Sequence, residues 1–269
     1  MNNKNFEYLR DQVKFTGFGE GLESDLKVNL QKEPAEFTLF HNTKFGNDQV
    51  DSALHFRKSD QTDMYFFNSY QVQMKNDHAP NTMEQTFYIN KSNNITLKEA
   101  YNLMNGRSVN KDLTNKEDQV YNAWVQMDFK QTDERGNFKM KQFHQNYGYD
   151  LGAALGKHPI KELTNDTDKT RLLESLQKGN LQSVTFEREG KEQKHFIEAN
   201  PQFKTINIYD SKMQRVTKQD LGEKEGKGEK DSVKQDKKES QKTGSDDEEG
   251  GSGGQKSNTK KKRKQHHSI

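Results

Sequence analysis

The sequence predicts an α+β fold of mainly antiparallel sheets with a few short packed helices and a disordered C-terminal tail. Apolar and polar residues alternate through several segments of strand length, and these segments are joined by short, turn-rich connections. Such connections are too short for crossover helices, which favours antiparallel pairing. The single Trp, the 9 Tyr and the 16 Phe all lie before residue 210, so the material for a core ends there.

The first half of the chain predicts two short helices followed by four strands. Phe6, Leu9 and Val13 share one face of the first helix, and three glycines within 17–21 predict a flexible turn after it. A Gly-Asn-Asp turn after residue 45 predicts a hairpin. The expected helices cover 5–15 and 22–30, and the expected strands cover 36–45, 49–56, 64–74 and 83–90.

The clearest helix in the sequence covers 95–106. Thr96 and Glu99 have the T-x-x-E spacing of a capping box, and Gly106 stands where a glycine ends a helix. A second helix is expected up to Gly179, with a glycine-weakened helical turn before Pro159. The remaining expected strands lie within 121–129, 138–145, 183–189, 191–199 and 202–210.

The domain organisation allows two interpretations. Residues 1–95 and 96–216 form either two α+β modules or one continuous domain, and 217–269 form a disordered charged tail. Residues 103–109 and 176–184 both run from a helix end through a glycine into a strand. Two related helix-plus-hairpin modules would explain this similarity, and so would chance.

Composition predicts a soluble, cytoplasmic protein. The net charge is +2, and this small excess comes from the tail, since the part before residue 217 holds one acidic residue more than basic ones. The absence of cysteine excludes disulfides and cysteine-ligated zinc. No apolar run indicates a signal peptide or a membrane span, so no membrane association is expected.

The sequence contains no motif that argues for catalysis, a cofactor or a metal. Residues 17–21 have neither the spacing of a dinucleotide fingerprint nor the Gly-Lys-Ser/Thr ending of a phosphate loop. His41 and His55 fall on the two arms of the expected hairpin, where they would face each other if its centre lay near Asp48, but solvent-facing histidines are favoured over a metal site. We therefore expect no cofactor, no metal and no enzymatic activity, although an active site assembled from distant residues leaves no such motif.

Aromatic residues on strands are the first candidates for a binding site. Alternation places Tyr65 and Phe67 on one face of their strand and Phe66 on the other, and Phe143 and Tyr147 form a second group. Exposed aromatic rings on a sheet stack the bases of single-stranded nucleic acids. The competing interpretation, which is the more common one for such residues, places them in the core.

The tail ends in a basic segment. Residues 251–269 contain six basic and no acidic residues, after the acidic run at 246–249. The six basic residues are candidates for contacts with nucleic-acid phosphates, which carry no sequence preference. They are Lys256, Lys260, Lys261, Lys262, Arg263 and Lys264. A merely solubilising tail, or one whose acidic run masks the basic segment, is the alternative.

Several segments of the chain resemble a known bacterial family. They are "YLRDQVKFTGFGEGL", "MYFFNSYQVQM", "LKEAYNLMNGRSVNKDL", "YNAWVQMDF" and "NPQFKTINIYD". The family is an uncharacterised one of Bacteroidetes, with a domain of unknown function, whose members are typical of conjugative and other mobile elements. The resemblance covers about 5–216 and implies an association with DNA processing, but it brings no catalytic residues.

Together these observations predict a non-enzymatic accessory protein of a bacterial mobile element. Its basic tail would contact nucleic acid, with DNA as the first candidate. The alternative is a protein-interaction module that binds its partner by a sheet surface or edge, with a solubilising tail.

Overall fold

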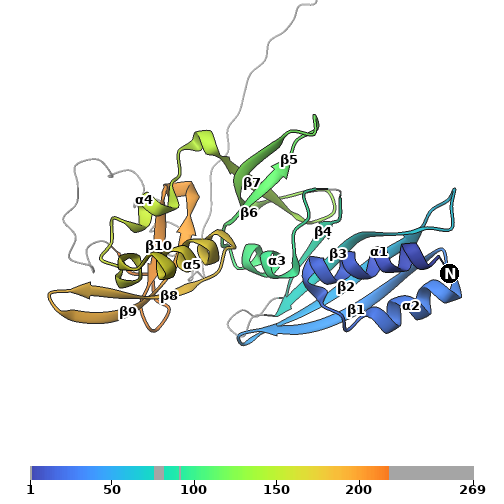
Figure 1. The fold of residues 1–269 in the computed structure, drawn as a ribbon, viewed down its shortest axis with the longest axis horizontal. Helices are drawn as coiled ribbons and strands as arrows, with labels where there is room; N and C mark the ends of the chain where they lie inside the picture. The colour runs from blue at the N-terminus through green and yellow to red at the C-terminus, as the bar shows by residue number, and fades with distance from the viewer. Residues whose placement is uncertain (1, 76–81, 91, 218–269) are drawn as a thin grey trace, which may run out of the picture. The chain divides into compact units, whose positions relative to one another are not determined.

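The computed structural model describes residues 2–75, 82–90 and 92–217, and these residues confirm the α+β fold (Figure 1). The helices are α1 (Asn3–Val13), α2 (Glu23–Lys32), α3 (Leu97–Met104), α4 (Leu151–Leu155) and α5 (Asp166–Gln177). The strands are β1 (Glu36–Phe45), β2 (Asp48–Lys58), β3 (Tyr65–Lys75), β4 (Met83–Tyr88), β5 (Val109–Thr114), β6 (Val120–Thr132), β7 (Phe138–His144), β8 (Gln182–Arg188), β9 (Lys191–Asn200) and β10 (Thr205–Tyr209). Short helical turns are η1 (Lys14–Phe18), η2 (Gln145–Tyr147), η3 (Lys161–Thr164) and η4 (Pro201–Phe203). The tail predicted to be disordered lies outside the described residues from 218 onward.

The three sheets within the described ranges are antiparallel meanders, in which each strand pairs with its neighbour in sequence. Their orders are β1-β2-β3-β4, β5-β6-β7 and β8-β9-β10. The order of a helix, a glycine and a three-stranded meander occurs twice, because α3 leads into β5–β7 and α5 leads into β8–β10. Gly106 and Gly179 each stand three residues before the strand that follows, which is the similarity visible in the sequence.

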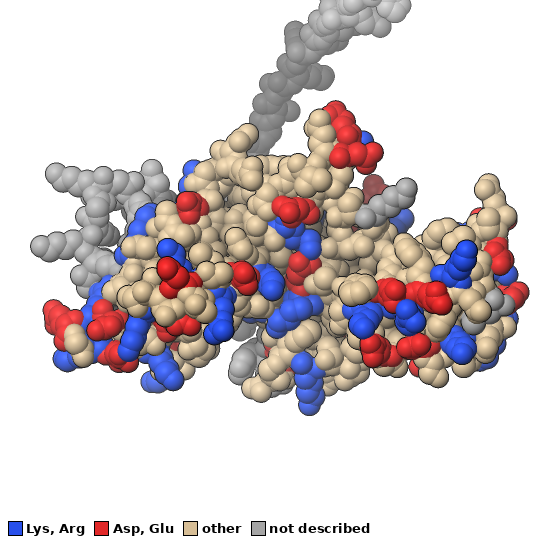
Figure 2. All heavy atoms as spheres, viewed as in Figure 1, with Lys and Arg blue, Asp and Glu red and all other residues tan. Residues whose placement is uncertain are grey.

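Charged side chains of both signs are interspersed over the surface. Figure 2 shows Lys and Arg beside Asp and Glu across the face that is drawn, over helices and strands alike. This distribution agrees with the near balance of acidic and basic residues before the tail.

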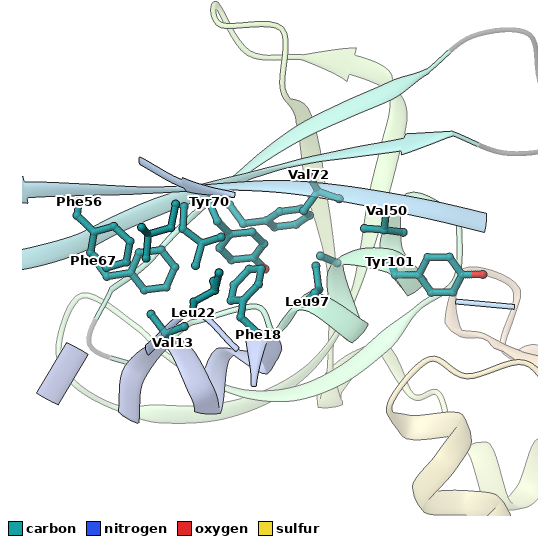
Figure 3. Packing of buried hydrophobic residues seen from close by; sticks show 14 of the residues in the cluster. Val13, Phe18, Leu22, Val50, Phe56, Phe67, Tyr70, Val72, Leu97 and Tyr101 are labelled. Carbon is teal, nitrogen blue, oxygen red and sulfur yellow. The ribbon is translucent and has the colours of Figure 1, made fainter. Parts of the chain in front are cut away.

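The first hydrophobic core lies between one face of the β1–β4 sheet and the helices α1, α2 and α3. Phe56, Phe67 and Tyr70 of the sheet face Val13 and other apolar residues of the helices (Figure 3). Phe18 of η1 meets the Tyr70 ring edge-on, with 5.2 Å between the ring centroids. Tyr70 is fully buried, and its hydroxyl donates a hydrogen bond to the Ile95 carbonyl at 2.6 Å, which satisfies the one polar atom of the ring.

The turn at 17–21 is a packed element of this core. Gly17 has φ 102°, and a Cβ atom placed on it would lie 3.4 Å from Leu97 at the start of α3. Phe18, the next residue, is buried. The glycine therefore provides both a left-handed turn and a close approach of two chain segments, rather than the loose connection that the sequence indicated.

Strand β6 connects the two hydrophobic cores. Ala123, Val125 and Met127 point into the first core, whereas Trp124 points into a second core formed by α4, α5 and β8–β10. This alternation follows from strand geometry, which sends successive side chains to opposite faces. The first core contains α3, β5 and β6 together with the elements before residue 95, so this core extends across 95/96.

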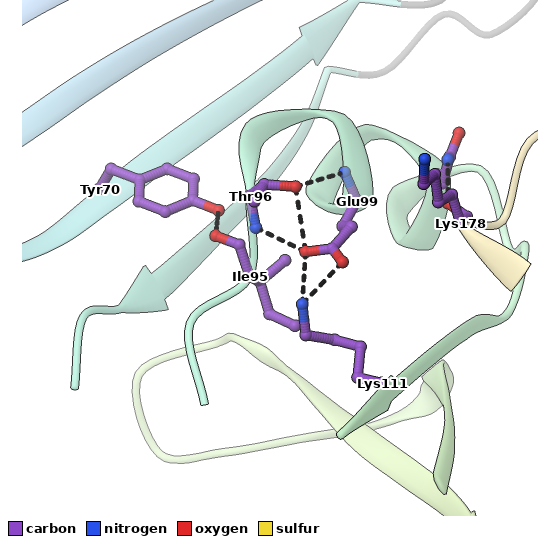
Figure 4. Close-up of polar contacts among 7 residues, drawn as sticks. Tyr70, Ile95, Thr96, Glu99, Lys111 and Lys178 are labelled. Atoms are coloured by element: carbon purple, nitrogen blue, oxygen red, sulfur yellow. Dashed lines mark hydrogen bonds and ion pairs between the residues drawn. The ribbon is translucent and has the colours of Figure 1, made fainter. Parts of the chain in front are cut away.

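The predicted capping box is present at the start of α3 (Figure 4). The Thr96 hydroxyl accepts a hydrogen bond from the Glu99 backbone N–H at 3.4 Å, and the Glu99 carboxylate accepts one from the Thr96 N–H at 2.8 Å. The same carboxylate forms an ion pair with Lys111 of β5 at 2.6 Å. Glu99 thus joins the first turn of α3 to the second sheet.

We expect Thr96→Ala to lower the free energy of unfolding by about 1 kcal/mol, because it removes the N-cap acceptor. Urea denaturation followed by circular dichroism measures the change. Thr167→Ala is the matched control, since Thr167 is an exposed residue inside α5 and its loss should change stability little. An equal effect of both substitutions would contradict a role of the cap.

Candidate nucleic-acid interface

The outer face of the β1–β4 sheet carries three exposed aromatic side chains. Phe40, Phe66 and Tyr88 are 77%, 47% and 48% exposed. They lie on the side opposite the first core, because their strand neighbours Leu39, Phe67 and Phe87 are buried in that core. Most large apolar side chains of this sheet are buried, so three exposed rings on one face are the surface feature that most resembles a binding platform.

A β-bulge decides which aromatic residues of β3 reach the outer face. Phe56 pairs with Phe67 and His55 pairs with Ser69, so Asn68 has no partner on β2. The extra residue shifts the alternation, and as a result Tyr65 and Phe67 before the bulge and Tyr70 after it all enter the core. Phe66 is the aromatic residue of this strand that stays outside.

Two of the exposed rings have an arginine beside them. Phe66 is the cross-strand partner of Arg57 on β2, and the Arg57 guanidinium, on a side chain that is 62% exposed, forms an ion pair with the exposed Asp60 at 3.4 Å. The Arg135 guanidinium donates a hydrogen bond to the Tyr88 hydroxyl at 2.6 Å, with its carbon 6.0 Å from the centre of the Tyr88 ring. An aromatic face next to a guanidinium suits a nucleotide, because the base stacks on the ring and the cation meets the phosphate. We call Phe66, Arg57, Tyr88 and Arg135 the aromatic–arginine face.

Two acidic residues on this sheet face accept hydrogen bonds from neighbouring amides. Glu84 accepts hydrogen bonds from Gln71 and from Gln73, each at 2.7 Å. Asp51 accepts hydrogen bonds from Asn42 and Gln49. Because acidic and amide side chains lie beside the rings, the outer face as a whole is polar and not strongly basic.

The four aromatic residues singled out from the sequence differ in how far the structure buries them. Tyr65 and Phe67 are each 3% exposed, so the prediction that they stack a base is wrong, because the helices cover their side of the sheet. Phe143 is partly buried against the second core. Tyr147 is 39% exposed, and its ring lies 5.0 Å from the Phe143 ring and 4.8 Å from the Lys204 ammonium group. Of the four, only Tyr147 is an exposed residue.

The basic residues of the tail lie outside the described part of the chain. These are the predicted phosphate contacts Lys256, Lys260, Lys261, Lys262, Arg263 and Lys264. Their role stays a prediction from the sequence.

The two histidines of the β1–β2 hairpin do not face each other. The hairpin turns at Gly46 and the following residue, so His41 pairs with Ser52 and His55 pairs with Thr38. His41 meets the Phe18 ring edge-on at 5.5 Å, and burial lowers its pKa. His55 Nδ1 lies 3.2 Å from the Thr38 hydroxyl. Neither histidine is fully exposed, and among the described residues no group of three or more His, Asp or Glu is placed to hold a metal ion.

A second group of cations and aromatic rings lies where α3 meets the β1–β2 turn. The Lys98 ammonium group lies 4.4 Å from the centre of the Phe45 ring and 4.6 Å from that of Tyr101. Burial, followed by the nearby Arg107, lowers the pKa of Lys98. The Tyr101 hydroxyl donates to an Asp48 carboxylate oxygen at 2.8 Å, and burial raises the pKa of Tyr101. The Tyr101 hydrogen bond to Asp48 holds α3 to the hairpin.

The aromatic–arginine face was missed in the sequence because its members come from four separate elements. Tyr88 and Arg135 lie 47 residues apart. The alternation in 83–90 does place Tyr88 on the face opposite Phe87, but it does not reveal which face is open. The exposed side of each strand becomes clear only when the positions of the helices are known.

No family model, curated protein or solved structure matches the chain. In the ranges that the structure describes, no helix has both the length and the apolar character needed to cross a membrane.

Proposed function

We propose that the protein is a non-catalytic accessory factor of a bacterial mobile element that binds single-stranded nucleic acid. Bases stack on Phe66 and Tyr88, and the arginines beside these rings contact the phosphates. The observation that carries the proposal is an open sheet face on which the Arg135 guanidinium donates a hydrogen bond to the exposed Tyr88 ring's hydroxyl, and on which the exposed Phe66 is the cross-strand partner of Arg57. The resemblance of the quoted segments to mobile-element proteins supports the cellular setting.

The geometry of the face favours a single strand over a duplex. Phe66 lies three residues along β3 from Ser69, the partner of Tyr88, which corresponds to roughly 10 Å. Rings at this spacing accept unstacked bases, whereas in a duplex the bases are stacked on one another and their faces are covered. The basic segment of the tail adds affinity without adding sequence preference.

Binding of a labelled single-stranded DNA or RNA oligonucleotide to the full chain, measured by fluorescence anisotropy, tests the proposal. We expect Phe66→Ala and Tyr88→Ala each to weaken binding by about 1–3 kcal/mol, which is the usual contribution of one stacked base. Phe203→Ala is the matched control, because Phe203 is 51% exposed but lies on η4, away from this face. If the control weakens binding as much as the two variants do, the face is not the site.

The salt dependence of the same measurement separates the tail from the face. Replacing the six basic residues of 251–269 by glutamine should make the log–log salt slope less steep by about 4, since single strands release about 0.7 counterion for each neutralised phosphate. It should leave the effect of Phe66→Ala unchanged. Absence of binding at low salt by the unchanged protein would overturn the proposed function.

A second candidate function is a protein-interaction module, which the polar character of the outer face favours. Glu84 and Asp51 keep that face from being strongly basic, and a neutral surface with exposed aromatic residues also suits a protein partner. A protein that fails to bind nucleic acid, but whose surface at Phe66 and Tyr88 is protected from hydrogen exchange by a cellular partner, would support this candidate instead.

A further inference from the structure

Strand β1 presents a long open edge. It is the outermost strand of its sheet, it has ten residues from Glu36 to Phe45, and its pairing with β2 is free of bulges. Within the described ranges, no further strand pairs with its outer side. Other edge strands have a contact on their outer side. The Gln85 side chain of β4 pairs with the Phe138 backbone, and Phe186 of β8 forms a bridge with Ile160. Proteins ordinarily protect an edge of this length, because unpaired backbone groups invite another strand.

The hairpin turn determines which backbone groups of β1 point outward. Phe45 pairs with Asp48 across a two-residue turn, and Gly46 has the positive φ of 63° that its first position requires. In such a hairpin the closing pair exchanges hydrogen bonds, so every second residue counted back from Phe45 faces β2. The residues that direct their N–H and C=O groups away from β2 are therefore the five between these, namely Glu36, Thr38, Phe40, Asn42 and Lys44.

These five residues are complementary to themselves when the strand is reversed. If two β1 strands run antiparallel with Phe40 opposite Phe40, then Glu36 lies opposite Lys44 of the second copy. Thr38 lies opposite Asn42 of the second copy in the same register. The pairing thus has two opposite-charge pairs, two polar pairs and one aromatic pair on the two-fold axis, which are the combinations that stabilise neighbouring strands.

Other registers lose this complementarity. A shift by two residues in one direction places Thr38 opposite Lys44 and Phe40 opposite Asn42. A shift in the other direction places Glu36 opposite Asn42 and Thr38 opposite Phe40. Both shifts separate the charges and leave the Phe40 ring without an aromatic partner, so the centred register is favoured.

We propose that β1 pairs with β1 of a second copy of this chain, which makes one continuous antiparallel sheet of eight strands in a two-fold symmetric dimer. Phe40 is the most exposed large apolar residue of the described chain, at 77%, and it occupies the axis of this pairing. The five outward-facing residues all place their side chains on the outer face, so α1 and α2 stay on the opposite side in both copies. The proposal does not depend on nucleic-acid binding, because the dimer edge is β1 and the aromatic–arginine face is formed by β2, β3, β4 and the turn before β7.

A substitution at the axis tests the dimer. Sedimentation velocity of the full chain over a range of concentrations should show a monomer–dimer equilibrium, and Phe40→Lys should raise the dissociation constant at least tenfold by placing two ammonium groups opposite each other. Val120→Lys is the matched control, because Val120 is 71% exposed at the start of β6. A protein that stays monomeric at all concentrations, or a dimer that both substitutions weaken equally, would overturn the proposal.

A charge exchange tests the register. Glu36→Lys alone and Lys44→Glu alone each place like charges opposite each other and should weaken the dimer, whereas the double variant should restore its dissociation constant to within about threefold of the original. Glu36 is also the cross-strand neighbour of Arg57 in its own chain, so thermal melting of each variant separates a loss of folding from a loss of pairing. A double variant that is weaker than both single variants would contradict this register.

A single introduced thiol reports the geometry directly, since the chain contains no cysteine. In the centred register, the two Cα atoms of residue 40 would lie about 5.5 Å apart, which is within the range that a disulfide spans. Phe40→Cys should therefore form a covalent dimer under mild oxidation, seen on a non-reducing gel, and Val120→Cys should not. Failure of Phe40→Cys to cross-link at concentrations where the unchanged protein is dimeric would place the interface elsewhere.

Discussion

Gly179→Ala should lower the free energy of unfolding by about 3 kcal/mol. Gly179 ends α5 with φ 78°, a conformation that costs an L-residue about 1–2 kcal/mol. A Cβ atom at this position would lie 2.9 Å from the Ser108 carbonyl oxygen and 2.9 Å from a methyl group of Val109. The carbonyl is part of the backbone and cannot move aside as a flexible side chain would, so overpacking adds a further 1–3 kcal/mol or so.

The position of Gly179 explains why the effect should be large. The Asn102 side chain, which is fully buried, donates to the Lys178 carbonyl at 2.7 Å and to the Asn180 side chain at 3.1 Å. The end of α5 is thereby held against α3 and the start of β5. A shift that relieved the new Cβ atom would weaken these buried hydrogen bonds.

Gly190→Ala is the matched control for this prediction. Gly190 also has a positive φ, of 72°, but no atom lies within 4 Å of the Cβ that would be added. Its cost should be limited to the left-handed conformation, about 1 kcal/mol. Urea unfolding followed by the fluorescence of Trp124, the only tryptophan, measures both variants. Equal costs would show that the contact with Ser108 contributes nothing.

Local rules were enough to predict most of the elements. The hairpin of β1 and β2 follows from alternation on both sides of a Gly-Asn turn, and the start of α3 follows from Thr96 and Glu99. Gly106 and Gly179 end their helices as predicted, and both have a positive φ. In each case the residues that determine the element are neighbours in sequence, so no information about packing was needed.

The candidate site could not be predicted in the same way. Asn68 is the extra residue of the β3 bulge, but nothing in "MYFFNSYQVQM" separates it from an ordinary strand residue. Without the bulge, alternation places Tyr65 and Phe67 on the face opposite Tyr70, and the core side of the strand is then ambiguous. The partners Tyr88 and Arg135 meet only because the turn between β6 and β7 approaches β4, which is a matter of tertiary packing.

The way in which the two hydrophobic cores share strand β6 also could not be predicted from the sequence. Trp124 and its neighbours in β6 read as one apolar run, and such a run does not indicate that its two faces serve different cores. Gly106 and Gly179 each end a helix three residues before a strand, and this similarity suggested related modules. It did not reveal that Gly179 packs on Ser108, which lies two residues after Gly106. Contacts of this kind join residues about 70 positions apart, which no local pattern encodes.

Asn5→Ala should cost about 3 kcal/mol of unfolding free energy, a large effect for a polar residue in the first turn of a helix. The Asn5 side chain is 2% exposed and pairs with both backbone groups of Tyr65 in β3. Its amide nitrogen donates to the Tyr65 carbonyl at 2.9 Å, and its oxygen accepts from the Tyr65 N–H at 2.7 Å. Alanine would leave two buried backbone groups without partners, and each such loss costs about 1–3 kcal/mol.

A similar arrangement occurs on β4 of the same sheet. The Gln85 side chain of β4 accepts from the Phe138 N–H at 2.8 Å and donates to the Phe138 carbonyl at 3.3 Å. In both places a side-chain amide makes the two hydrogen bonds that a neighbouring strand would otherwise make, because it has one donor and one acceptor at the spacing of a peptide group. Asn5 thereby fixes the position of α1 along β3.

Asn29→Ala is the matched control for Asn5→Ala. Asn29 is half-buried on α2 and donates one hydrogen bond to the Asp25 carbonyl of its own helix, so its loss should change stability by less than about 0.5 kcal/mol. Because Asn5 joins α1 to the sheet, hydrogen exchange in the Asn5→Ala variant should rise first in α1 and at the start of β3. A variant whose unfolding free energy stays within 1 kcal/mol of the original would show that water replaces the amide, and that α1 is held by its apolar face alone.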